Sequence, residues 1–142
     1  MEYRALFEPA EEGGFTITFP DFGWGVSQGE TEQDSREMAV ALLQTLVQEH
    51  IRRGEKLPKS GNPRGRKYRA IRLPAMQAAK AELYRQFKAS GLRKIDLARR
   101  MGIPKSIVDR LFDLKHHSRL EQLEAAFSAL GKELTIEIRD AA

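Results

Sequence analysis

Two stretches near the start of the chain alternate apolar and polar side chains with a period of two. Tyr3, Ala5 and Phe7 alternate with the charged Glu2, Arg4 and Glu8, and apolar residues 15, 17 and 19 alternate with threonines. This spacing predicts two half-buried strands. Glu11–Gly14 supplies a turn between them, because glycine tolerates a positive φ. Val26 and Ser27 predict a short third strand.

The period then changes to that of a helix. Thr31 and Asp34 resemble a capping box, which predicts that a helix begins there, and Gly54 predicts its end. Residues 58–67 contain prolines, glycines and a basic run and predict a loop, and Tyr68–Leu73 predicts a fourth strand. One helix packed on a small sheet is the architecture that these elements favour. The apolar stripe of the helix consists of Ala39, Leu42, Leu43, Leu46 and Ile51.

The second half of the chain contains four helical segments divided by glycines. Apolar stripes that stop at glycine or proline predict helices from Met76 to Gly91, at Arg93–Met101 and at Pro104–Asp113. Ser118 and Glu121 have the spacing of a capping box, which predicts a fourth helix that Gly131 ends. Leu134, Ile136 and Ile138 then alternate with polar residues, which predicts a C-terminal strand.

These elements predict an α+β protein of two small domains. Residues 1–74 form a β-β-β-α-β domain, and residues 75–142 form an all-α domain with a helix-turn-helix and a C-terminal strand. Because domains of this size have thin cores, we expect stabilisation by a partner or by self-association.

The helix pair 93–113 has the residues that a helix-turn-helix needs. Ala98 is small where the two helices touch, and Gly102 permits the positive φ of the turn. The second helix is expected to bury Ile103, Val108 and Leu111 against the first. The spacing resembles the repressor and Cro-like class, Xre type, across roughly residues 76–131. An ordinary helical hairpin with a glycine turn is the alternative.

Charge is segregated along the chain and suggests two different partners. The net charge is +4, yet residues 1–60 hold 6 basic and 11 acidic side chains, whereas residues 75–120 hold 11 basic and 4 acidic ones. Residues 61–74 hold 5 basic side chains and no acidic one, and residues 121–142 hold 2 basic and 5 acidic ones. The basic region suits double-stranded DNA, and the acidic front favours a basic protein.

The side chains expected on DNA divide by chemistry. Arg110 suits bidentate pairing with guanine, and Lys105 reaches guanine or a phosphate. Ser106 and Asp109 lie on the same outward face of the second helix. For every basic side chain expected on DNA, an ordinary solvated position on the surface is the alternative. The side chains expected on phosphates are Arg93, Lys94, Arg99, Arg100 and Lys115.

A series of short motifs runs through residues 1–73. In chain order they are Tyr3 and Phe7, Gly13-Gly14-Phe15, Phe19-Pro20-Asp21, Gly29-Glu30-Thr31, the helical residues 39–41 and Leu57-Pro58. In this order they resemble the HicB family of antitoxins. The resemblance implies a partial ribonuclease-H-like fold, binding and inhibition of a small basic messenger-RNA-cleaving toxin, HicA, and repression of the operon by a DNA-binding domain. The sequence departs from the family at Phe22–Gly25, where Pro-Gly-Cys is common.

Two contact surfaces follow from this interpretation. The loop carrying Asp21, Phe22 and Trp24 is expected to expose aromatic surface and to cover the active site of the toxin. Self-association, as a homodimer or higher oligomer, is expected through the last helix and the C-terminal strand of two chains. Folding of that strand onto the front sheet is the alternative. The residues expected at the dimer contact are Phe127, Leu130, Leu134, Ile136 and Ile138.

Other classes of function have weak support. Asp21 is the one acid firmly at a strand end of the front domain, His50 lies near the apolar edge of its helix, and the adjacent His116 and His117 point in different directions. We therefore expect no catalytic residues, no metal and no cofactor. The absence of cysteine excludes disulfides and fits a reducing cytosol. No apolar run approaches the roughly 18 residues of a membrane span, so we expect a cytoplasmic protein.

Two further interpretations without catalysis remain open. The chain is also compatible with a stand-alone transcriptional regulator whose front domain senses a small ligand near Trp24. A pure scaffold is the third alternative. Binding of a small basic protein distinguishes the antitoxin from the regulator, and binding of DNA distinguishes both from the scaffold.

Overall fold

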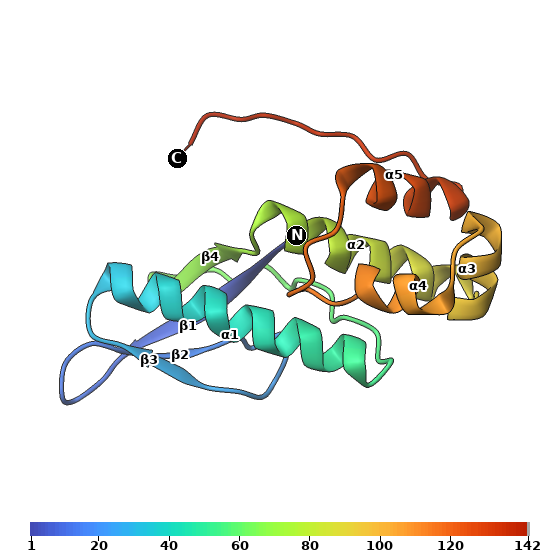
Figure 1. Ribbon diagram of the computed structural model, residues 1–142. Coiled ribbons are helices and arrows are strands. Elements are labelled where there is room, and N and C mark those ends of the chain that lie inside the picture. Colours follow the sequence, from blue (N-terminus) through green and yellow to red (C-terminus); the bar gives the residue numbers. More distant parts are fainter. Residues whose placement is uncertain (142) are drawn as a thin grey trace.

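Four strands form one antiparallel sheet within residues 1–141, the part of the chain that the computed structural model describes (Figure 1). β1 (Glu2–Pro9) lies between β2 (Phe15–Thr18) and β4 (Tyr68–Arg72), and β3 (Ser27–Gly29) pairs with β2. Alternate residues 3, 5 and 7 of β1 are fully buried. The period-two pattern therefore predicted both the strands and the face that they bury, and the third strand lies one to two residues later than expected.

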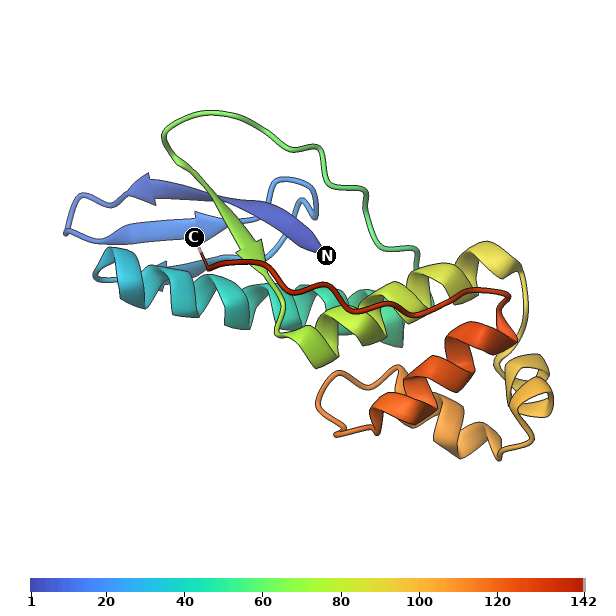
Figure 2. The ribbon, with the colours of Figure 1, turned by 90° about the horizontal axis from the view of Figure 1, so that it is seen from above.

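α1 (Glu32–Arg52) covers one face of this sheet (Figure 2). Its capping is as predicted at the first turn, where the Asp34 amide donates to Thr31 Oγ1 at 3.0 Å. The Asp34 carboxylate in turn accepts from the Glu30 amide at 2.8 Å, so two orphan amides are satisfied together. The side chains that α1 buries against the sheet include Ala39, Leu43, Leu46, Val47 and Ile51.

Four helices follow the sheet: α2 (Ala75–Ser90), α3 (Lys94–Met101), α4 (Lys105–Leu111) and α5 (Leu120–Ala129). The glycine stops between them are confirmed, since Gly91, Gly102 and Gly131 all have positive φ. The predicted capping box at Ser118 is wrong. Arg119 is the N-cap of α5 without a side-chain bond, and the buried Ser118 Oγ has no hydrogen-bond partner.

The two halves of the chain share one cluster of buried side chains. Tyr84 and Phe87 of α2 pack on Phe112, which follows α4, with ring centroids 5.5 and 5.0 Å from it. The segment between α1 and β4 is attached to both halves by hydrogen bonds. Tyr84 Oη donates to the Glu55 carbonyl at 2.8 Å, and Tyr3 Oη donates to the Pro58 carbonyl at 2.6 Å.

The predicted C-terminal strand is not formed in the single chain. Residues 132–141 are irregular and run from α5 along α2 towards β4 (Figures 1 and 2). Residues of the tail and Ala70 and Arg72 of β4 line one open pocket of about 760 Å³, and the described part of the tail makes no backbone ladder with β4. Ile136 and Ile138 are 67% and 89% exposed. Alternation alone does not make a strand, because a strand also needs a neighbour whose backbone groups it can pair with.

Candidate functional site

The α3–α4 turn has the geometry that the sequence predicted. Gly102 adopts φ 68°, and its amide donates to the Arg99 carbonyl at 3.2 Å. The next amide, of Ile103, reaches back to the Ala98 carbonyl at 3.0 Å, which completes a Schellman-type end to α3. Val108 and Leu111 are fully buried between the two helices, as predicted, whereas Ile103 is only partly buried. α3 and α4 are therefore two short helices that are joined by a glycine turn and packed against each other.

The opposite face of α4 is open. Lys105, Ser106 and Arg110 are exposed, as predicted, whereas Asp109 is only half-exposed. Asp109 accepts from Lys94 Nζ at 2.9 Å and from Lys105 Nζ at 3.2 Å. Burial alone would raise the pKa of Asp109, but hydrogen bonds from the two lysines outweigh it and hold that pKa below its usual range. Asp109 therefore joins α3 to α4.

Several cations expected on phosphates already have partners within the chain. Arg93 makes a bidentate pair with Asp96, at 3.0 and 3.1 Å, and its own amide donates to the same carboxylate. These bonds lower the pKa of Asp96 to about 2. Arg100 Nη1 donates to the Ala129 carbonyl at 3.1 Å, at the end of α5. Arg93 and Arg100, which the sequence assigned to phosphates, therefore also stabilise the positions of α3 and α5.

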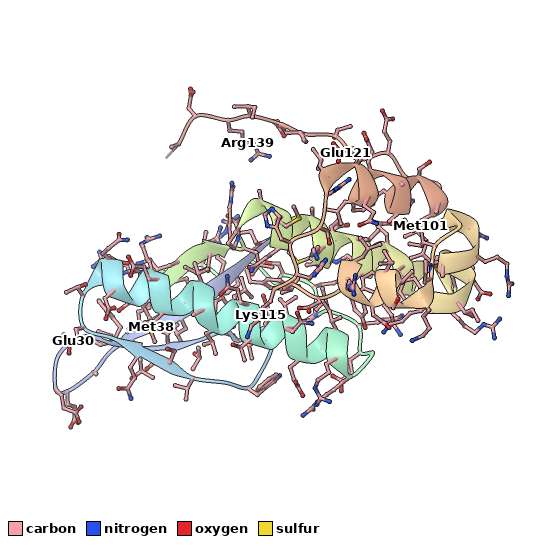
Figure 3. The ribbon with its side chains drawn as sticks, viewed as in Figure 1. Glu30, Met38, Met101, Lys115, Glu121 and Arg139 are labelled. Carbon is pink, nitrogen blue, oxygen red and sulfur yellow. The ribbon has the colours of Figure 1, made fainter. Side chains whose placement is uncertain are left out.

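Two predicted DNA contacts differ in position. Arg99 is exposed on α3, and its only ion pair among the described residues is a long one, 3.9 Å from Asp96. Lys115 is exposed too, but it lies beside α1, in a pocket lined by Thr45 and Glu49 among others (Figure 3). Arg99 therefore lies on the helix pair itself, whereas Lys115 lies against α1 in the other half of the chain.

The sequence interpretation missed a polar cluster at the end of α4. Lys80 of α2 is fully buried, and its Nζ donates to the carbonyls of Arg110 and Asp113, both at 2.8 Å. Burial lowers the pKa of Lys80 to about 8, against the opposing effect of the Asp113 carboxylate. A signal was present in the sequence, because Lys80 lies four residues after Met76 and three before Leu83, on the apolar stripe of its helix.

The aromatic loop before β3 is only partly exposed. Trp24 is 42% exposed and stacks on His50 of α1, with ring centroids 6.3 Å apart and an interplanar angle of 24°. The prediction that Phe22 is exposed is wrong, since it is 9% exposed and packs against Tyr3, Phe19 and His50. Phe22 points inward because Gly23 and Gly25, both at positive φ, turn the chain on either side of Trp24.

Asp21 also has a role inside the chain. Its Oδ2 accepts from the Gly61 amide at 3.1 Å, and this bond ties the aromatic loop to the segment before β4. Among residues 1–141, no three His, Asp or Glu side chains lie close enough together to hold a metal ion. Of the helices described, none combines the length and the apolar character that a membrane span requires.

An acidic groove of about 890 Å³ lies at the far end of α1 from Trp24. Its walls are the β1–β2 turn, β3 and the first turns of α1, and its apolar surface comes from Phe15 and Met38. Figure 3 shows Glu30 and Met38 at one end of the molecule and Met101 of α3 at the other. Among the described residues, none of its four acids makes an ion pair: Glu11, Glu12, Glu30 and Asp34.

The edge of the sheet connects this groove to Trp24. β3 has a single neighbour, so one row of its backbone groups is unpaired within the sheet. Residues alternate along this edge, and the exposed ones are Trp24, Val26, Gln28 and Glu30. We call these four residues the β3 edge surface. It is apolar at the Trp24 end and acidic at the groove.

Comparison with known proteins shows similarity over the whole chain. Residues 2–82 match the family described as HicB-like antitoxin of bacterial toxin-antitoxin system. Antitoxin HicB 1 of Photorhabdus laumondii subsp. laumondii is 37% identical over 138 residues, which cover 97% of this chain and 87% of that protein. Antitoxin HicB of Escherichia coli K12 is 34% identical over 136 residues, 96% of this chain and 98% of that protein. Antitoxin HicB of Pseudomonas fluorescens Pf0-1 is 31% identical over 146 residues, 99% of this chain and all of that protein.

Proposed function

This chain belongs to the HicB-like antitoxin family, and from that premise we propose that it binds and inhibits a small basic messenger-RNA-cleaving toxin of the HicA type and represses its own operon. The observation that carries the proposal is the placement of an acidic groove and a basic helix pair at opposite ends of one molecule (Figure 3). In this proposal residues 1–74 are a partial ribonuclease-H-like, toxin-binding domain, and residues 75–142 are an Xre-type DNA-binding and dimerisation domain.

The toxin binds along the β3 edge surface and into the groove. Trp24 offers a rigid aromatic anchor that is already held by His50, so little conformational entropy is lost when it is covered. The unpaired acids of the groove attract a basic partner and orient its approach. The unpaired backbone of β3 also offers main-chain hydrogen bonds to an extended segment. Asp21 supports the loop through the Gly61 amide, and Phe22 packs against His50, the residue on which Trp24 stacks.

The DNA-binding end reads bases with α4. Arg110 and Lys105 extend from its exposed face towards base edges in the major groove, and Ser106 lies between them. Lys94 and Arg99 of α3 contact phosphates and supply the part of the affinity that depends on salt. Because Lys94 is paired with Asp109, it also fixes the angle between the two helices. Arg93 and Arg100 act mainly within the fold, and Lys115 lies too close to α1 to belong to the same surface.

Two copies of the chain pair through their C-terminal tails. Leu134 is half-buried, whereas Ile136 and Ile138 are exposed on a segment without a backbone partner. Pairing with the tail of a second copy would satisfy that backbone and cover the isoleucines, and two-fold symmetry suits an operator with two half-sites. Phe127 is buried in the core of its own chain and supports the contact from within, beside the half-buried Leu130.

A co-expression experiment tests both halves of the proposal. The full chain is produced together with the small basic protein encoded beside its gene, and cleavage of messenger RNA is measured with and without the chain. We expect a stable complex and suppressed cleavage. In parallel, the chain is titrated against a duplex carrying the promoter of its own gene and against a scrambled duplex. A complex that forms without suppressing cleavage would refute inhibition, and equal affinity for the two duplexes would refute operator binding.

A further inference from the structure

We propose that Gln48, Gln77 and Lys80 form a clamp that positions the base-reading helix α4, so that the clamp determines how well the protein distinguishes its operator from other DNA. The inference rests on the proposed DNA-binding function of α4. The clamp residues come from α1 and α2, and what they hold is the backbone of residues 110–114, directly at the end of α4.

Lys80 is the centre of the clamp. A fully buried ammonium group is costly unless its donors find acceptors, and here two carbonyls lie 2.8 Å from Nζ. The two carbonyls belong to Arg110 and Asp113, at the C-terminal end of α4. Helix ends of this kind carry unpaired carbonyls and partial negative charge. Lys80 therefore holds the end of α4 through two hydrogen bonds and through the attraction of its positive charge to the negative end of the helix.

The two glutamines hold the next residues of the same segment. Gln48 Oε1 accepts from the Leu114 amide at 2.7 Å, and Gln48 Nε2 donates to the Phe112 carbonyl at 3.3 Å. Gln77 Nε2 donates to the Leu114 carbonyl at 3.4 Å, and Gln77 is itself oriented by a 2.8 Å bond from Gln44. The carbonyls of residues 110, 112, 113 and 114 thus all accept bonds from side chains of α1 or α2.

The position of the clamp distinguishes it from a DNA contact. Lys80 has no exposed surface, so it acts on DNA only through α4. The carbonyl that it binds belongs to Arg110, the same residue whose side chain extends from the exposed face. Base readout requires placement to within about 0.5 Å, whereas phosphate contacts by long side chains tolerate larger shifts. Loosening the clamp therefore affects base readout before it affects general affinity.

The experiment uses two clamp variants and one matched control in the full chain. Lys80→Met keeps the apolar length and removes the donors, and Gln48→Met removes the bonds from α1. Lys67→Met makes the same change as Lys80→Met at an exposed position in the segment before β4. Each variant is titrated against the promoter duplex and a scrambled duplex, and its thermal unfolding is recorded. The ratio of the two affinities is the readout, because a loss of folded protein lowers both affinities together.

We expect Lys80→Met to bind the promoter duplex roughly tenfold more weakly, with the affinity for the scrambled duplex within about twofold of the original. Gln48→Met has the same effect to a smaller extent, and Lys67→Met leaves the ratio unchanged. If Lys80→Met does not fold, Gln48→Met decides. An unchanged ratio in the folded clamp variants overturns the inference while the DNA-binding proposal stands. A wild-type chain that does not distinguish the two duplexes refutes that proposal, and the inference with it.

Discussion

The acidic groove and the α3–α4 pair are opposite in charge, and they also differ in how much of their charge is free. The four acids of the groove make no ion pair among the described residues, whereas Arg93, Lys94 and Lys105 are already bound to Asp96 or Asp109. An acidic surface of this kind attracts a basic partner over a distance. The paired basic surface is organised in advance and loses less entropy when it binds. The acidic groove thus suits long-range attraction of a basic partner, and the α3–α4 pair suits the directional reading of bases.

Truncation after Gly131 is expected to have the largest effect on this comparison. Loss of the paired tails leaves each helix pair to bind one half-site, and promoter affinity falls by about a hundredfold or more. The groove and the β3 edge surface remain, so inhibition of the toxin is retained. Sedimentation reports the mass, and the promoter titration and the cleavage assay report the two functions. A truncated chain of native mass and affinity would show that the tail is not the dimer contact.

Trp24→Ala tests the other end. An aromatic anchor at the centre of an interface contributes about 2 kcal/mol or more, so toxin binding weakens by more than tenfold while promoter binding stays the same. Leu120→Ala is the control, because Leu120 is 45% exposed, close to the value for Trp24, but lies on α5. Calorimetric titration with the toxin measures both. Equal affinity of wild type and Trp24→Ala for the toxin would remove the aromatic loop from the interface.

Arg110→Ala tests directional readout at the basic end. We expect a loss of about 1–3 kcal/mol on the promoter duplex and much less on the scrambled one. Arg99→Ala is its counterpart on α3 and should weaken both duplexes about equally, because a phosphate contact carries no sequence information. Fluorescence anisotropy with both duplexes gives the four affinities. If Arg110→Ala lowers both equally, Arg110 contacts phosphate.

Removal of two of the four negative charges of the groove tests long-range attraction. The double variant Glu12→Gln, Glu30→Gln is expected to slow toxin association several-fold at low salt, with little effect at high salt where the charges are screened. Dissociation changes little. Glu121→Gln, at the start of α5 and far from Glu30, is the control (Figure 3). Stopped-flow measurements at two salt concentrations give the association rates. An association rate that does not depend on salt would contradict the long-range attraction of the toxin by the groove.

Asp96→Asn is expected to have the smallest effect, a small destabilisation near neutral pH that disappears in acid. The folded protein holds the pKa of Asp96 near 2, below its ordinary value of 3.8. The stabilising contribution is therefore complete above the ordinary value and is lost as the pH falls through about 2. The thermal midpoint of Asp96→Asn should lie below that of wild type near neutral pH. The two midpoints should converge as the pH falls from 3.8 towards about 2. A constant difference from pH 7 to pH 2 would exclude the Arg93 ion pair as its source.

Local sequence pattern predicted every strand of the sheet and all five helices to within a few residues. It succeeded where a short range of neighbours decides the outcome, as at the Thr31 cap and the Gly102 turn. The prediction failed where the structure of a segment depends on residues far away in the sequence or on a second chain. Phe22 is buried because Tyr3 and His50 meet it from other elements, and residues 133–138 lack the neighbour that would make them a strand.

The candidate site was predicted in part for the same reason. The exposed face of α4 follows from helical spacing, so Lys105, Ser106 and Arg110 were found. The pairing of Lys94 with Asp109 spans 15 residues and depends on the angle between two helices, which no local pattern specifies. The acidic groove brings the β1–β2 turn beside the start of α1, and the sequence indicated its charge without its shape.

The hydrogen-bonded segment between α1 and β4 limits how the two halves can be exchanged. Its Glu55 and Pro58 carbonyls are held by Tyr84 of one half and Tyr3 of the other, and Gln48 of α1 reaches the end of α4. A chimera that joins the front half of one relative to the back half of another must carry these partners across together. In the proposed function, the ability to distinguish the operator would therefore depend on Gln48 of the front half as well as on α4.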